Sequence, residues 1–127
     1  MFNVDEKTGT IICRQGDTGV YILEGLPTLE GMYDEEVFFS FYNNKRVIIG
    51  ELSATPIDGQ VTFFIPASIT DNLTVSSGMS TATYYYGAKL CYRDEDGNEY
   101  EDTLIIGDKM LDEVNKVVVY PKIVEGY

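Results

Sequence analysis

The sequence predicts an all-β fold, either a sandwich or a barrel. Short apolar runs separated by turn signals recur along the whole chain, which is typical of strands joined by tight connections rather than of alternating helices and strands. The 127 residues include ten Tyr and six Phe, and the weight of Tyr, Phe, Val, Ile and Thr favours strands. The chain is most simply one domain, residues 1–127, with its core over 10–120 and a short C-terminal tail at 121–127.

Eight strands are expected, each from an alternating or β-branched run between turn formers. They are Thr10–Arg14, Val20–Glu24, Val37–Tyr42, Lys45–Ala54, Val61–Ile65, Thr81–Tyr92, Tyr100–Ile106 and Lys116–Tyr120. Pro66 ends the fifth strand, and the weaker pattern over Ala67–Leu73 indicates one short helical turn. A hairpin turn is expected at Asn43-Asn44.

The triplet Asp17-Thr18-Gly19 has two readings. Dimeric aspartic proteases carry such a triplet in each half-site, where two adjacent carboxylates share one proton because both cannot ionise. Their triplet follows an apolar strand, whereas a run of Arg, Gln and Gly precedes this one and favours a solvated turn. We therefore expect Asp17 to lie in the connection between the first two strands, and we expect no catalytic residue.

The acidic run from Asp94 to Glu99 invites a calcium reading. An EF-hand loop, however, requires Gly where Glu99 stands and a bidentate Glu where Ile105 stands, so a hairpin turn with solvated charges is expected instead. The chain has no His, and Cys13 and Cys91 do not have a metal-ligand spacing, so neither a metal nor a cofactor is expected. Both cysteines are expected to be free, buried thiols, with one bridge between strands as the alternative.

The net charge bears on the class of partner. With 21 acidic and 9 basic residues, the formal charge is -12. Such a surface repels phosphate backbones and anionic lipid headgroups, so neither nucleic acid nor a membrane is an expected partner. A small acidic inhibitor that mimics DNA is the alternative of another class, although the acidic residues stand in turns rather than along one face. No signal-peptide pattern or membrane span is apparent, so synthesis in the cytoplasm is expected.

Three consecutive tyrosines, residues 84 to 86, lie in the longest expected strand. Tyr is favoured at interfaces because it buries much area at little entropic cost and keeps one polar end. Simple alternation is the other reading. It places Tyr84, Tyr86, Ala88, Leu90 and Tyr92 on the core face. Tyr85 then lies on the opposite face and is the candidate contact residue of this strand.

The order of several motifs resembles a known family. An apolar strand running into RQGDTG is followed by an aromatic strand with a short hairpin, then by IDGQVTFFIP, and then by TATYYYGAKLCYRDEDGNEYEDTLIIGD. This order, over about Thr10 to Tyr120, resembles the N-terminal domain of phage baseplate upper proteins and related phage tail-fibre attachment domains. The individual motifs are short, and their order carries the resemblance.

The resemblance implies an immunoglobulin-like antiparallel β-sandwich of about eight strands with a structural, non-enzymatic role. It implies a bacteriophage virion protein of the baseplate, tail or fibre-attachment machinery that binds other virion proteins, as a homo-oligomer or in many copies. Within this class, the alternative is a capsid decoration or head-fibre anchoring protein. The three consecutive valines and the terminal Tyr indicate that the tail adds a strand to a neighbour's sheet edge. The expected interface residues are Tyr85, Tyr120, Ile123, Val124 and Tyr127.

Overall fold

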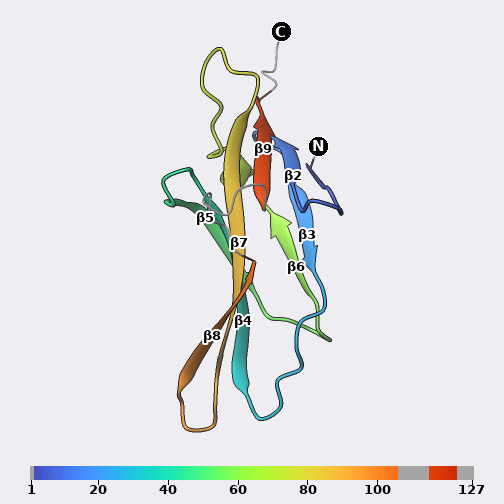
Figure 1. Cartoon of the computed structure of the whole chain (residues 1–127), viewed down its shortest axis with the longest axis vertical. Coiled ribbons are helices and arrows are strands. Elements are labelled where there is room, and N and C mark those ends of the chain that lie inside the picture. Colours follow the sequence, from blue (N-terminus) through green and yellow to red (C-terminus); the bar gives the residue numbers. More distant parts are fainter. Residues whose placement is uncertain (1, 106–114, 123–127) are drawn as a thin grey trace.

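Two β-sheets pack face to face in the computed structural model, which describes residues 2–105 and 115–122 (Figure 1). The elements are β1 (Phe2–Val4), β2 (Ile11–Arg14), β3 (Gly19–Leu23), β4 (Tyr33–Tyr42), β5 (Ile48–Ala54), β6 (Val61–Ile65), α1 (Ala67–Thr70), β7 (Ala82–Arg93), β8 (Glu99–Ile105) and β9 (Lys116–Tyr120). The all-β sandwich expected from the sequence is confirmed, and so is the short helical turn after Pro66. Ile106, expected to end a strand, lies outside the described residues.

The strand order explains how the sandwich is built. The larger sheet runs β1-β2-β9-β7-β4-β5, with β8 also paired to β7, and the smaller sheet consists of β3 and β6. Strands β9, β7, β4 and β5 facing β3 and β6 have the order of G, F, C and C′ facing B and E in immunoglobulin-like sandwiches. One described pair departs from the expected antiparallel pairing: β2 and β9 run parallel, with Ile11 opposite Val117. The two strands are far apart in the chain, so no tight turn forces them to be antiparallel.

A cluster of aromatic rings joins the sheets. Phe39 of β4 has the ring centroids of Tyr21, Phe63 and Tyr86 at 4.8, 5.2 and 5.4 Å. The core face expected for β7 is confirmed for Tyr86, Ala88 and Leu90, which are buried. The other strands bury one face in the same way, with Ile11, Cys13, Val37, Phe39, Phe41, Val61, Phe63 and Ile65 in the core. Tyr84 and Tyr92, expected on the same face of β7, are half-buried because the strands of the smaller sheet are much shorter than β7.

Strand β1 was not expected from the sequence. It is only three residues long and lies in a mixed polar segment, so its own pattern is too short to predict a strand. It forms because it pairs with β2, with Phe2 opposite Cys13.

The turn between β4 and β5 is longer than the Asn43-Asn44 pair that the sequence indicates. The side-chain oxygen of Asn43 accepts hydrogen bonds from the backbone N–H groups of Lys45 and Val47, at 2.8 and 3.0 Å. Arg46 has a φ of 63°, which no strand residue adopts. The strand expected from Lys45 therefore begins only at Ile48.

Strand β7 is the centre of the larger sheet and pairs along both edges. On one edge it pairs with β4. On the other edge it pairs first with β9, where Tyr85 lies opposite Lys116, and then with β8, where Ala88 lies opposite Ile105. Strands β8 and β9 therefore occupy successive stretches of one edge.

Candidate protein-protein interface

The Asp17-Thr18-Gly19 triplet lies where the chain crosses from β2 in the larger sheet to β3 in the smaller one, as expected of a connection. The N–H of Asp17 donates to the carbonyl of Arg14 at 3.0 Å, and Gly16 between them has a φ of 89°, as a type II turn requires. Gly19 is required by packing, because a Cβ at this position would lie 2.1 Å from the Phe2 ring.

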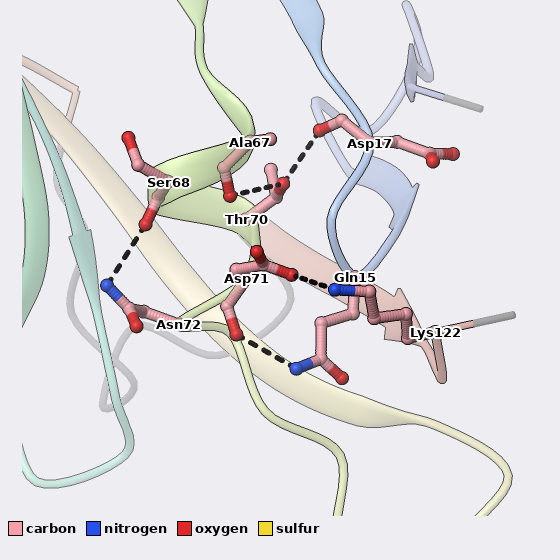
Figure 2. A network of polar contacts seen from close by, with 8 residues as sticks. All are labelled: Gln15, Asp17, Ala67, Ser68, Thr70, Asp71, Asn72 and Lys122. Atoms are coloured by element: carbon pink, nitrogen blue, oxygen red, sulfur yellow. Dashed lines mark hydrogen bonds and ion pairs between the residues drawn. The ribbon is translucent and has the colours of Figure 1, made fainter. Parts of the chain in front are cut away.

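The backbone of Asp17 also holds α1 in place (Figure 2). The buried hydroxyl of Thr70 donates to the Asp17 carbonyl at 2.7 Å. Next to this bond, the Gln15 side chain donates to the carbonyl of Asp71 at 2.8 Å, and the ammonium group of Lys122 lies 3.0 Å from the Asp71 carboxylate. These contacts join the β2–β3 connection, α1 and the end of β9. Asp17 and its neighbours therefore hold the backbone of these three segments together.

The acidic run at residues 94–99 forms the tip of the β7–β8 hairpin, as expected. Asp94 accepts hydrogen bonds from the N–H groups of Asp96 and Asn98, from the Asn98 side chain and from the Tyr100 hydroxyl, at 2.9 to 3.0 Å. The bonds from Asn98 lower the pKa of Asp94 most. Within residues 2–105 and 115–122, no group of three or more His, Cys, Asp or Glu side chains could hold a metal ion.

Both cysteines are free, so the alternative of a bridge is wrong. Cys13 is fully buried in β2, and burial raises its pKa from 9.0 to about 11. Cys91 is only half-buried, contrary to expectation, because it lies on the outer face of β7 opposite Glu101. Desolvation and the Glu101 charge raise the pKa of Cys91.

Two of the five expected interface residues lie in the described part of the chain. Tyr85 and Tyr120 are both on the outer face of the larger sheet, at opposite ends of β9. Tyr85 is half-buried, and Tyr120 is 37% exposed with the Arg14 guanidinium 5.9 Å from its ring centroid. Ile123, Val124 and Tyr127 lie outside the described residues. The structure therefore places Tyr85 and Tyr120 on one surface without bringing them into one cluster.

A more exposed apolar surface lies on the smaller sheet. Val20 lies opposite Phe64 and Ile22 lies opposite Thr62, so the four side chains form one patch, which we call the β3–β6 outer face. Val20, Ile22 and Phe64 are 46%, 50% and 74% exposed. Large apolar side chains gathered in this way mark contact surfaces more often than single exposed ones do.

The sequence analysis missed the β3–β6 outer face, although a signal was present. In β3 and β6, apolar residues occupy both faces of the strand, as in the runs GVYIL and VTFFI. A strand with one face in the core and the other in water normally alternates apolar with polar residues. Apolar residues on both faces of β3 and β6 therefore indicate that the outer face, exposed in the single chain, is a contact surface for another molecule.

The outer face of the larger sheet is acidic instead. A groove of about 480 Å³ over β4, β5, β7 and β8 is lined by five carboxylates and two cationic side chains: Asp34, Glu36, Glu51, Glu99, Glu101, Lys89 and Arg93. Lys89 lies 3.4 Å from Glu101, and Arg93 lies 3.1 Å from Glu99. Acidic residues thus also gather along strands, whereas the sequence analysis placed them in turns.

Comparison of the chain with protein-family models, curated proteins and solved structures gave no match. Across the described segments, no helix has the length and apolar character needed to cross a membrane. The class of protein is given by the fold and its surfaces: an all-β sandwich with an apolar face on one side and an acidic face on the other.

Proposed function

We propose that this chain is a non-enzymatic structural protein of a bacteriophage particle, an assembly module of the tail, baseplate or fibre-attachment machinery. The observation that carries the assembly role is the exposed β3–β6 outer face, where Phe64 is 74% exposed. The resemblance in motif order supports the placement in a virion. Other virion proteins are the proposed partners, and a capsid decoration or head-fibre anchoring role is the alternative within the same class.

The C-terminal tail is proposed as a second contact of this module. The described chain ends at Lys122, beside Asp71 and close to the β2–β3 connection. The next five residues include Ile123, Val124 and Tyr127. These residues would supply apolar side chains to the sheet edge of a neighbour. Deleting residues 123–127 while keeping Lys122 should reduce incorporation into particles. Unchanged incorporation would exclude the tail as a contact.

Mass spectrometry of density-purified phage particles tests the proposed function. We expect the chain in the particles at a fixed ratio to the major capsid protein. A high ratio would indicate capsid decoration, and a low one a tail, baseplate or fibre ring. Absence from particles, together with abundance in infected cells, would contradict the proposal and favour the acidic inhibitor.

A further inference from the structure

The β3–β6 outer face is continuous and is bordered by a hollow. Phe64 stands out from β6 with Val20 beside it on β3. A hollow of about 410 Å³ lies against the same two side chains and is completed by Thr18, Gly19, Ile65 and Pro66. A projecting ring next to an apolar hollow is a shape that can complement a copy of itself across a two-fold axis.

The two strands of this face carry no charge. The segments GVYIL and VTFFI contain no Asp, Glu, Lys or Arg, whereas each other described strand of four or more residues contains at least one. The whole chain has a formal charge of -12, so two copies repel each other over most of their surfaces. Contact through β3 and β6 removes no strand carboxylate from water, and it therefore avoids the desolvation cost of burying an unpaired charge.

The acidic groove lies on the opposite side of the sandwich. Most of its carboxylates stand on the outer face of the larger sheet. Glu36 of β4 and Glu101 of β8, for example, lie opposite Cys91 of β7, one on each side of it. Two copies joined through the β3–β6 outer face keep these grooves on the far sides of the pair. This arrangement separates the two acidic faces by the thickness of both sandwiches.

From these observations we infer that two copies of this chain pair about a two-fold axis through their β3–β6 outer faces, with Phe64 of each copy in the hollow beside Val20 of the other. The inference rests on the proposed function for treating this face as an interface, and it names a second copy as the occupant. A second copy matches this face because it offers the same neutral, apolar surface and the same hollow.

Sedimentation velocity of the purified chain over a range of protein and salt concentrations tests the inference. We expect a reversible dimer that tightens as NaCl rises from about 20 mM to about 0.5 M, because salt screens the repulsion between the two acidic copies. A basic partner held by the acidic groove would show the opposite salt dependence. A single-chain mass under all conditions, or a dimer that salt weakens, would overturn the inference.

Two substitutions locate the contact. Phe64→Asp places carboxylates on both sides of the two-fold contact and should weaken the dimer at least about tenfold. Ile57→Asp is the matched control, since Ile57 is 72% exposed but outside the face, and it should leave the dimer unchanged. Ile22→Asp repeats the test at a second position, with circular dichroism as the check of folding. Equal dimerisation of the wild type and both face variants would also overturn the inference.

The outcomes separate this inference from the proposed function. A chain that is monomeric in solution but present in phage particles would retain the assembly role with another partner on the face. A chain that dimerises as described but is absent from particles would retain the dimer and lose the virion role.

Discussion

At the scale of single residues, Phe2 and Gly19 explain the glycine of the Asp-Thr-Gly triplet. A Cβ on Gly19 would lie 2.1 to 2.5 Å from three atoms of the Phe2 ring, so the aromatic ring needs the space that glycine leaves. The triplet that resembles a protease motif is thus accounted for by a turn at Gly16 and by this ring packing.

Gly19→Ala is therefore expected to lower the free energy of unfolding by about 1–3 kcal/mol, because either the Phe2 ring or β3 must move. Urea unfolding measures the change. In a Phe2→Ala background the clash is absent, and Ala is the better strand residue, so the same substitution should be neutral or slightly stabilising. Equal costs in the two backgrounds would contradict the packing explanation.

Cys13 makes the free energy of unfolding depend on pH in the alkaline range. Its pKa is about 11 in the folded protein against an ordinary value of 9.0, so above pH 9 the unfolded chain loses the thiol proton first. The stability that this proton provides is complete below pH 9 and is lost as pH rises towards 11.

In urea unfolding between pH 9 and 10, the wild-type free energy of unfolding should fall more steeply than that of Cys13→Ala, by up to about 1.4 kcal/mol per pH unit. Burial also raises the pKa of Tyr86, which acts in the same direction at higher pH, so only the difference between the two proteins reports on Cys13. Cys91→Ala, at a half-buried position, should keep most of the wild-type slope. Identical slopes for wild type and Cys13→Ala would contradict this account.

At the scale of elements, one buried hydroxyl joins α1 to the connection between the sheets. Thr70→Val keeps the side-chain shape and removes the 2.7 Å bond to the Asp17 carbonyl, so it should lower the free energy of unfolding by about 1–2 kcal/mol. The measurement is thermal or urea unfolding.

Lys122→Met is the comparison within the same network. It removes an ion pair whose two side chains are about half exposed, so it should cost less than about 1 kcal/mol and lose its effect in high salt. The same substitution as Thr70→Val at exposed Thr103 should be close to neutral. A larger cost for Lys122→Met than for Thr70→Val would reverse the order that burial predicts.

Most elements could be predicted because their patterns are local. Val37, Phe39 and Phe41 alternate with less buried residues, and this period predicts the second half of β4. The polar start of β4, from Tyr33 to Glu36, was expected to be a loop because it carries no apolar alternation. Strand β1 depends on its partner β2, so its three residues carry no independent signal. The β3–β6 outer face was missed because the sequence analysis used the alternation in Val61, Phe63 and Ile65 only to separate two faces, and did not use the apolar residues on the second face of these strands.

At the scale of the whole molecule, the chain contains no histidine. Histidine is the side chain whose ordinary pKa lies between pH 5 and 8, so no histidine switch links stability to pH in this range. The free energy of unfolding should stay constant within about 0.5 kcal/mol from pH 6 to pH 8, and on the alkaline side it should fall only above pH 9. Urea unfolding in a series of buffers at equal ionic strength measures this plateau. A slope inside it would reveal a titrating group that the described residues do not account for.

The shared edge of β7 has a consequence for how the sequence can change. The last residue of β8, Ile105, lies opposite Ala88, and the first residue of β9, Lys116, lies opposite Tyr85. The two strands therefore meet one edge of β7 at positions only three residues apart. A substitution that displaced this edge of β7 would disturb both pairings at once.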